Sequence, residues 1–373
     1  MVSSSTKNSI DREMNGFSNK NWLHAHFPNV NAAANSLYRI FRWYGRNNSP
    51  RAWRRLLRYY FTQAFRPAGP AFIILAPTYR CQCHCVHCGV TRTPGHEEQE
   101  IDTELIKSVL DQAARLGVIQ VVLSGGEPLL RDDLEDAIRH ARGLGIITRV
   151  ITNGLLLDRS RVRQLKQAGL TQCSVSIDDA DPSVHDRMRG FPGAFAKALE
   201  GIKNLKESGI LVQLHTYAAK RNVVDGLERL IALGRRLGVF SVCIGFPMAI
   251  GRWENEIDQV LTEEDRFKVR QLQDLGFVHV ELATPLTHCR VSSRHFLFVS
   301  PNGDVTPCPF VPYVVGNLKD FSLEDIWKAY CSGRKMEFRG RCPMNDPRDR
   351  ESIRKYVERS AKFLAAKGTK WAS

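Results

Sequence analysis

The sequence lacks several features that would assign it to a specialised class of protein. No apolar run reaches the roughly 18 residues that a membrane-spanning helix needs, and the first residues, MVSSSTKNSIDRE, contain no apolar signal core. There is also no internal repeat and no low-complexity tract. These absences argue against a membrane span, a secretory signal and disorder, so we expect a folded cytoplasmic protein. With 373 residues and 43% hydrophobic content, the chain can bury a large core without disulfides.

An excess of positive charge is found at both ends of the chain and is nearly absent from its middle. The net charge is +14, but residues 1–66 carry eleven Lys or Arg against two acidic residues, and residues 351–373 carry six against two. The stretch between them is nearly neutral, and no nucleic-acid motif accompanies the basic ends. We therefore expect no nucleic-acid partner. Docking on an anionic membrane surface stays open but is not favoured.

The N-terminal segment predicts helices. Residues Leu37 to Tyr44 show apolar side chains at helical spacing, and a second helix begins with Ser49 as its cap and Pro50 at its first position. The apolar face of that helix would contain Trp53, Leu56, Leu57, Tyr60, Phe61 and Ala64. Its opposite face carries Arg51, Arg54, Arg55 and Arg58. We expect the apolar face to pack on the rest of the protein and the arginines to be solvated.

From residue 71, short β-like runs alternate with amphipathic helices, which is typical of a parallel sheet built from βα units. The predicted strands are 72–76, 118–123, 146–152, 172–177, 210–215 and 241–245. The predicted helices are 103–116, 132–143, 159–168, 194–208 and 224–236. Six such units are too few to close an eight-stranded barrel. The pattern therefore predicts an α/β fold, a partial (β/α)6 TIM-like barrel that is open on one side.

The ten cysteines are too many and too clustered for disulfides in a reducing compartment. Cys81, Cys83, Cys85 and Cys88 lie within eight positions, where thiolates can bind a metal or an iron–sulfur cluster. The alternative is a structural zinc site in which His84 and His87 join the thiolates, but a zinc ribbon predicts a second cysteine pair nearby, and the next eighty residues contain none. Cys173 and Cys243 are isolated, and a buried core thiol is the favoured interpretation of both.

The cysteine segment is followed, after the next predicted strand, by Gly125-Gly126-Glu127-Pro128. This combination resembles the radical S-adenosylmethionine (SAM) superfamily. The resemblance implies that Cys81, Cys85 and Cys88 hold a 4Fe-4S cluster with one open iron, and that Cys83 stays outside the ligand set. The site residues that it implies for SAM are Gly125, Gly126, Glu127, Asn153, Ser176 and Arg189. The cysteine segment and residues 124–128, 152–154 and 176–178 each lie at or just beyond the C-terminal end of a predicted strand. These four motifs would therefore meet at one rim of the barrel, where parallel α/β barrels bind ligands.

The resemblance also implies an activity. An external flavodoxin- or ferredoxin-type donor would supply one electron, and SAM would be cleaved reductively to methionine and a 5′-deoxyadenosyl radical that abstracts hydrogen from the substrate. No particular acid or base can be named as catalytic. SAM could be consumed or regenerated. An epimerisation would need a thiol donor, for which Cys173 and Cys331 are candidates.

The last quarter of the chain resembles the auxiliary-cluster domain called SPASM, or twitch in its shorter form. The resemblance rests on Cys289, Gly303 and Cys308 and on a late thiolate, Cys342, with a hairpin predicted between 296–299 and 305–307. It implies one auxiliary 4Fe-4S cluster on Cys289, Cys308 and Cys342. Its fourth ligand stays open between Asp346 and a substrate atom, and Cys331 would be an unusual ligand. A zinc-stapled subdomain is the alternative.

These considerations predict four segments in the chain. They are a basic, largely helical extension (1–66), a radical SAM partial barrel (67–282), an auxiliary iron–sulfur domain (283–350) and a basic C-terminal helix (351–373). The resemblance implies a peptide or natural-product substrate that undergoes oxidation or bond formation. The runner-up is a lipid or tetrapyrrole, which the basic aromatic N-terminus motivates. An alternative of another class is a zinc-binding module without enzymatic activity.

Overall fold

The computed structural model describes residues 48–63, 69–89, 99–223, 225–246, 248, 250–253, 261–274, 276–281, 294, 296–332, 338 and 342–366. The chain divides into two units, residues 1–48 and 49–373, and the described residues after residue 48 all belong to the second. The helix predicted around Leu37 to Tyr44 lies outside the described residues, as does Cys289. Among the described residues, no helix combines the length and the apolar character that crossing a membrane requires.

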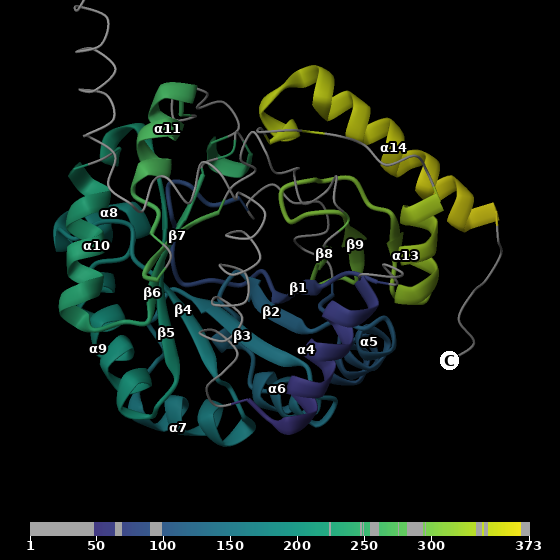
Figure 1. The fold of residues 1–373 in the computed structure, drawn as a ribbon, viewed down its shortest axis with the longest axis horizontal. Helices are drawn as coiled ribbons and strands as arrows, with labels where there is room; N and C mark the ends of the chain where they lie inside the picture. The colour runs from purple at the N-terminus through teal and green to yellow at the C-terminus, as the bar shows by residue number, and fades with distance from the viewer. Residues whose placement is uncertain are drawn as a thin grey trace, which may run out of the picture. The chain divides into compact units, whose positions relative to one another are not determined.

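A curved, mainly parallel sheet organises the second unit (Figure 1). Its parallel strands in chain order are β1 (Phe72–Thr78), β2 (Gln120–Gly125), β3 (Ile147–Thr152), β4 (Gln172–Ser176), β5 (Leu211–Tyr217), β6 (Ser241–Gly245) and β7 (Val278–Val280). Each pairs with the strand before and after it in this sequence. The partial α/β barrel expected from the sequence is confirmed, and β7 adds one strand to the six that were predicted.

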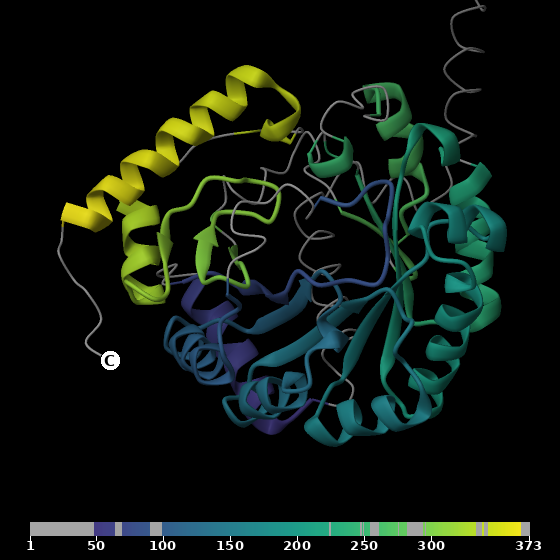
Figure 2. The ribbon, with the colours of Figure 1, turned by 180° about the vertical axis from the view of Figure 1, so that it is seen from behind.

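Helices cover the outer face of this sheet, as the view from behind shows (Figure 2). They are α5 (Thr103–Arg115), α6 (Leu134–Gly143), α7 (Arg159–Ala168), α8 (Pro182–Arg189), α9 (Ala194–Glu207) and α10 (Asp225–Leu237), with α11 (Glu263–Gln271) before β7. Aspartates cap several of them: the Asp158 carboxylate accepts from the Arg161 amide at 2.8 Å, and Asp181 caps α8 in the same way. Helix α8 was not predicted, because its eight residues carry few apolar side chains.

The two faces of the strands differ in chemistry. Val150, Val175, Leu214 and Val242 alternate with polar residues and belong to the main hydrophobic core beneath the helices. The opposite, inner face carries a hydrogen-bonded polar layer that links neighbouring strands. Its members include Gln120 with Gln172, Ser174 with Gln213, and Gln213 with Ser241. The inner face of β2, β4, β5 and β6 is therefore polar at this level of the sheet.

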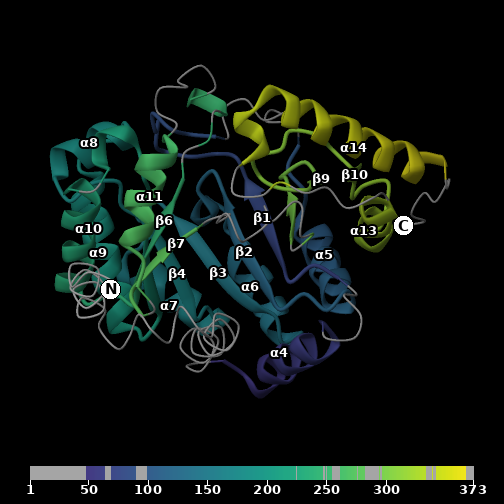
Figure 3. The same ribbon diagram turned by 45° about the horizontal axis from the view of Figure 1, so that its top comes forward.

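The C-terminal segment extends the same sheet. Strand β8 (Phe296–Val299) pairs in parallel with β1 and antiparallel with β9 (Asp304–Thr306), and β10 (Gly316–Asn317) completes that edge. The predicted hairpin is thus confirmed. Helices α13 (Leu323–Ser332) and α14 (Pro347–Ala366) follow, and they pack side by side in Figures 1 and 3. Tyr330 of α13 and Tyr356 of α14 stack edge to face, with ring centroids 5.6 Å apart.

Helix α4 (Pro50–Gln63) corrects one prediction. Leu56 is buried as expected, and Ala52, which was not predicted for the apolar face, is buried too, but Leu57 is 66% exposed. Arg55 is not solvated: its guanidinium donates to the carbonyl oxygens of Ala114 (2.8 Å) and Leu144 (3.0 Å). These carbonyls lie at the C-terminal ends of α5 and α6, where helix carbonyls lack partners within the helix. The arginine therefore fastens α4 to two barrel helices, a role that periodicity alone does not reveal.

Candidate functional site

The cysteine segment forms a loop that leaves the C-terminal end of β1. Cys83 and Cys85 are buried, Cys88 is half-buried and Cys81 is exposed. The thiols of Cys81 and Cys85 both interact with the Cys83 thiol between them. The sulfurs are thus gathered on one short loop at the rim that the sequence predicted.

A glycine turn at the end of β2 lies directly against this loop. The Gly126 amide donates to the Thr78 carbonyl at 2.9 Å, and the Glu127 amide donates to the Arg80 carbonyl at 2.8 Å. A Cβ atom on Gly126 would lie 2.3 Å from the Arg80 oxygen, and one on Gly125 would lie 2.6 Å from the Thr78 oxygen. Only glycine permits this close backbone contact.

The other side of the loop is held by α8 and by a turn after β6. The His84 amide donates to the Arg189 carbonyl at 2.8 Å. Arg252 contributes twice: its amide donates to the Cys88 carbonyl at 3.0 Å, and its guanidinium donates to the Cys85 carbonyl at 2.8 Å. The backbone that carries the cysteines is therefore fixed from both sides.

Glu127 links the glycine turn to the end of β3. Its carboxylate is fully buried and accepts hydrogen bonds from the Thr152 hydroxyl (2.8 Å), the Asn153 amide (2.8 Å) and the Leu129 amide (3.1 Å). Burial raises the pKa of Glu127 to about 7, although these donors oppose the shift. The Asn153 side chain in turn lies 3.8 Å from the Cys81 sulfur.

Arg189 connects the cysteine loop to a buried carboxylate. Its Nε lies 2.8 Å from Asp178 Oδ2, and its Nη1 lies 3.7 Å from the Cys85 sulfur. Burial, the largest single effect, would raise the pKa of Asp178, but the charge of Arg189 together with His87, His185 and Arg221 outweighs burial and holds that pKa below its usual value. The Asp178 amide donates to the His185 ring at 3.1 Å, which fixes the turn after β4. One arginine thus joins α8, β4 and the cysteine loop.

The sulfur chemistry of the loop fits an iron–sulfur cluster. Hydrogen bonding to Cys83 lowers the pKa of Cys81 to about 6 and that of Cys85 to about 7, and the charge of Arg189 acts in the same direction. The pKa of Cys83 is raised because its thiol is the donor to both neighbours. Thiolates are the ligands that such clusters take. The geometry therefore provides the donor set, and the choice of Cys81, Cys85 and Cys88 among the four cysteines remains that of the family resemblance.

Aromatic side chains line the interior next to the loop. The His87 ring lies 5.5 Å from the Tyr217 ring and 5.6 Å from the Trp253 ring. Burial lowers the pKa of His87 to about 4, so its imidazole is neutral at pH 7. Ser176 ends β4 and is 9% exposed; it lies opposite His215 in the strand register.

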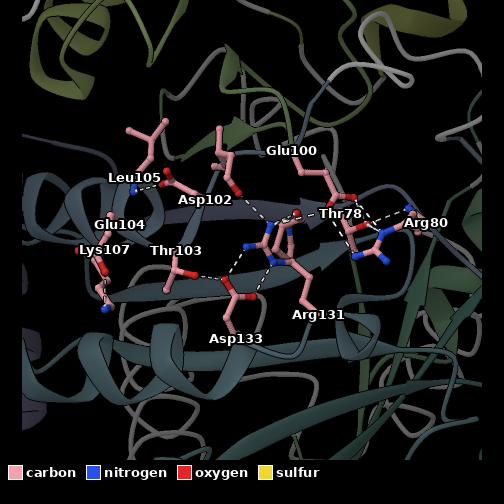
Figure 4. Close-up of polar contacts among 12 residues, drawn as sticks. Thr78, Arg80, Glu100, Asp102, Thr103, Glu104, Leu105, Lys107, Arg131 and Asp133 are labelled. Atoms are coloured by element: carbon pink, nitrogen blue, oxygen red, sulfur yellow. Dashed lines mark hydrogen bonds and ion pairs between the residues drawn. The ribbon is translucent and has the colours of Figure 1, made fainter. Parts of the chain in front are cut away.

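An arginine network supports the loop from the β1 side (Figure 4). Arg131, which is 9% exposed, donates to the carbonyls of Pro77 (3.1 Å) and Ile101 (2.9 Å) and forms a two-point ion pair with Asp133. Its Nη1 also lies 3.7 Å from Glu100. The same network includes Thr78, Arg80 and Thr103. It ties the last residues of β1, just before the cysteines, to the segment after the glycine turn.

The C-terminal cysteines are only partly described. Cys308 follows β9 and is 9% exposed, and the Cys342 sulfur lies 3.1 Å from the Met248 sulfur. Cys331 lies within α13, where burial raises the pKa of its thiol. One Asp346 oxygen accepts the Arg348 amide at 2.8 Å at the start of α14.

The predicted SAM residues therefore lie at the C-terminal ends of β2, β3 and β4 or on α8. Contacts join Glu127 to Asn153, Asn153 to Cys81, and Arg189 to Cys85. No local sequence pattern indicated Arg252 or Tyr217, which reach the site from distant elements. Asp178 could have been found, because it follows a buried strand at the same rim as the other site residues.

Two family models match the chain. The model of the radical SAM superfamily matches residues 75–232, and the model of an iron–sulfur cluster-binding domain, SPASM, matches residues 289–351. The first range covers the strands and loops that carry the cysteine loop, the glycine turn, Ser176 and Arg189. The second covers Cys289, Cys308 and Cys342.

Relatives with known roles are similar over most of their length. The chain is 30% identical to a PqqA peptide cyclase from Gluconobacter oxydans over 70% of this chain and 77% of the relative. It is 29% identical to an AdoMet-dependent heme synthase from Methanosarcina barkeri over 73% of this chain and 87% of the relative. Among solved structures, Streptococcus suis SuiB bound to its precursor peptide SuiA aligns with a TM-score of 0.56 and 15% identity, covering 81% of this chain and 70% of SuiB. At that identity the likeness concerns the fold.

Proposed function

The chain belongs to the radical SAM superfamily as an enzyme with a C-terminal SPASM domain, and we propose that it abstracts hydrogen from a carbon atom of a peptide or natural-product substrate. The observation that carries this proposal is the contact between the cysteine loop and the glycine turn. The amides of Gly126 and Glu127 hold the backbone just before Cys81. This contact supports the proposal, because it holds the loop that carries the cysteines directly against the glycine turn.

In this proposal Cys81, Cys85 and Cys88 hold the cluster, and Gly125, Gly126, Glu127, Asn153, Ser176 and Arg189 surround SAM. When bound, the cluster and SAM together supply one-electron cleavage of a carbon–sulfur bond. The chain's own residues position and shield that chemistry. Arg189 and Asn153 fix the loop through Cys85 and Cys81. The neutral imidazole of His87 packs between Tyr217 and Trp253 and excludes water from the inner side of the cysteine loop.

We extend the proposal to the SPASM domain. Cys289, Cys308 and Cys342 would hold one auxiliary 4Fe-4S cluster, and its fourth ligand would be Asp346 or a substrate atom. Protein ligation would favour electron transfer, whereas an open iron would favour substrate binding. Because a cluster that accepts an electron from a substrate radical suits oxidation or bond formation, we favour that outcome. An external flavodoxin- or ferredoxin-type protein would deliver the first electron.

The substrate class rests on relatives. One is named a PqqA peptide cyclase, and the SuiB structure contains a precursor peptide. These names favour a peptide substrate. A specific observation favours a second candidate, a tetrapyrrole, since another relative of similar identity is named an AdoMet-dependent heme synthase. The two candidates differ in whether the substrate is encoded as a peptide.

Formation of 5′-deoxyadenosine from SAM tests the proposal. Anaerobically reconstituted protein and a strong reductant should yield 5′-deoxyadenosine, and Cys85→Ala should abolish the yield. Cys83→Ala is the matched control, because it removes a buried thiol of the same loop and should retain the product. Equal yields from both variants, or no product from the wild-type enzyme with its full iron content, would overturn the proposal.

A further inference from the structure

Three side chains with different donor atoms meet on the inner face of the sheet, and none of them belongs to the cysteine loop or the glycine turn. They are His215 of β5, Cys243 of β6 and Glu281, which directly follows β7. Their ligand atoms all lie within 4.8 Å of one another. The strand register explains the meeting, because His215 lies opposite Cys243 and the Glu281 amide donates to the Ile244 carbonyl at 2.8 Å.

The inward direction of these side chains follows from strand alternation. Leu214 on β5, and Val242 and Ile244 on β6, belong to the hydrophobic core under the helices. The residues between them must therefore point the other way, into the barrel. Cys173 on β4 makes the contrast clear, because it is equally buried but belongs to the hydrophobic core. Cys243 was expected to be an ordinary core thiol, and its neighbours are instead an imidazole and a carboxylate.

An imidazole, a thiol and a carboxylate form a donor set that zinc takes in proteins. Tetrahedral zinc, with bonds of about 2.0–2.3 Å, brings its ligand atoms to roughly 3.5 Å of one another. Because the three ligand atoms lie within 4.8 Å of one another, each separation would need to contract by at most about 1.3 Å. Burial lowers the pKa of His215, which keeps the ring neutral and able to bind a metal. Sites with three protein ligands keep a fourth position for water or substrate.

We propose that His215, Cys243 and Glu281 bind a zinc-class divalent cation whose remaining coordination position faces the barrel interior and takes an anionic group of the substrate, such as a carboxylate. Metal binding is independent of the radical SAM chemistry. The role in orienting a substrate rests on the function proposed above.

The location suits that role. The Tyr217 ring lies 5.4 Å from the His215 ring and 5.5 Å from the His87 ring of the cysteine loop. One aromatic side chain therefore separates the proposed ion from the loop. The cations that act on His215 are Arg149 and Arg189. Arg149 donates to the Gln213 side chain in the polar layer at 3.3 Å, and Arg189 is paired with Asp178.

The test measures zinc and iron in the same samples. Full-length protein is reconstituted anaerobically until its iron content is constant, incubated with Zn²⁺ alone, desalted and analysed by elemental mass spectrometry. We expect about one zinc per chain that is lost in His215→Ala, Cys243→Ala and Glu281→Gln, while iron is unchanged. Cys173→Ala is the matched control and should retain the zinc. Zinc-edge X-ray absorption should show one sulfur at about 2.3 Å and nitrogen or oxygen at about 2.0–2.1 Å.

Two results would overturn the proposed zinc site. One is zinc content that is equal in all variants, and the other is an iron-loaded wild-type protein that binds no zinc. Because Cys243→Ala could fail to fold, its circular dichroism and iron content are compared with those of Cys173→Ala, and Glu281→Gln provides a milder change. Loss of SAM cleavage with zinc retained would count against the proposed function alone, so the two failures are distinguishable.

Discussion

The buried Glu127 carboxylate accepts a hydrogen bond of 2.8 Å from the Asn153 backbone amide, and this bond joins the glycine turn after β2 to the loop after β3. The other Glu127 oxygen accepts from Thr152 and Leu129. A carboxylate with protein donors on both oxygens acts as a strut between two loops of the site. It can serve this role whether or not it also contacts a ligand.

Stability should depend on the protonation of Glu127. Its pKa is raised to about 7 in the folded protein, so its contribution to the free energy of unfolding is complete below its ordinary pKa of 4.5 and is lost as the pH rises through 7. The advantage of wild type over Glu127→Gln should therefore shrink between about pH 5 and pH 8, by at most about 3 kcal/mol. Urea unfolding followed by circular dichroism measures the free energy of unfolding of both proteins at each pH. A difference between them that stays constant with pH would refute the raised pKa of Glu127.

The close contact of Gly126 with the cysteine loop predicts a strong effect of one methyl group. Gly126→Ala should lower the free energy of unfolding by about 1–3 kcal/mol and reduce SAM binding, because the new Cβ would lie 2.3 Å from the Arg80 carbonyl oxygen. Gly143→Ala is the matched control, since its Cβ meets nothing within 4 Å at the end of α6. It should be neutral or slightly stabilising. Equal effects in calorimetry and equilibrium SAM binding would contradict the contact.

Arg131 should matter more than its distance from the cysteines suggests. Arg131→Lys loses the two-point pair with Asp133 and at least one of the bonds to Pro77 and Ile101, so we expect a loss of about 2–4 kcal/mol. Arg139→Lys changes an exposed pair with Asp136 and should alter stability by less than about 0.5 kcal/mol. Thermal unfolding of both iron-loaded variants measures their losses of stability, and similar midpoints would show that the Arg131 network is dispensable.

Helix α4 should depend on Arg55 for its attachment. Arg55→Ala leaves the carbonyls of Ala114 and Leu144 without this donor, whereas Arg54→Ala changes an exposed side chain of the same helix. We expect faster amide hydrogen exchange across residues 50–63 in Arg55→Ala and unchanged exchange in Arg54→Ala. Unchanged exchange in both variants would mean that the apolar contacts of Ala52 and Leu56 hold the helix alone.

The barrel could be predicted from sequence because its signals are local and periodic. Strands such as Ile147–Thr152 and helices such as Arg159–Ala168 alternate with turns, so bounds agree to within a few residues. Helix α8 and strand β7 were missed, because an eight-residue helix with few apolar side chains and a three-residue strand carry too little periodicity. The parallel pairing of β8 with β1 joins residues more than two hundred positions apart, and no local pattern encodes it.

The site also contains residues that sequence patterns indicate and residues that they do not. The cysteine spacing and the Gly125-Gly126-Glu127 turn can be recognised in the sequence, and the structure brings those segments into contact. Sequence patterns do not indicate the supporting residues Arg131, Arg252 and Tyr217, because their side chains act by reaching across the fold. Cys243 is the clearest case. Its isolated position in the sequence suggested a core thiol, while strand alternation sets it beside His215 and Glu281.

The most direct test of the account is whether SAM changes the electron paramagnetic resonance spectrum of the reduced cluster that we propose on Cys81, Cys85 and Cys88. With anaerobically reconstituted, dithionite-reduced protein at low temperature, we expect SAM to shift the signal in wild type and in Cys83→Ala, and to have no such effect in Cys85→Ala. A wild-type protein with full iron content whose spectrum is identical with and without SAM would contradict the central claim.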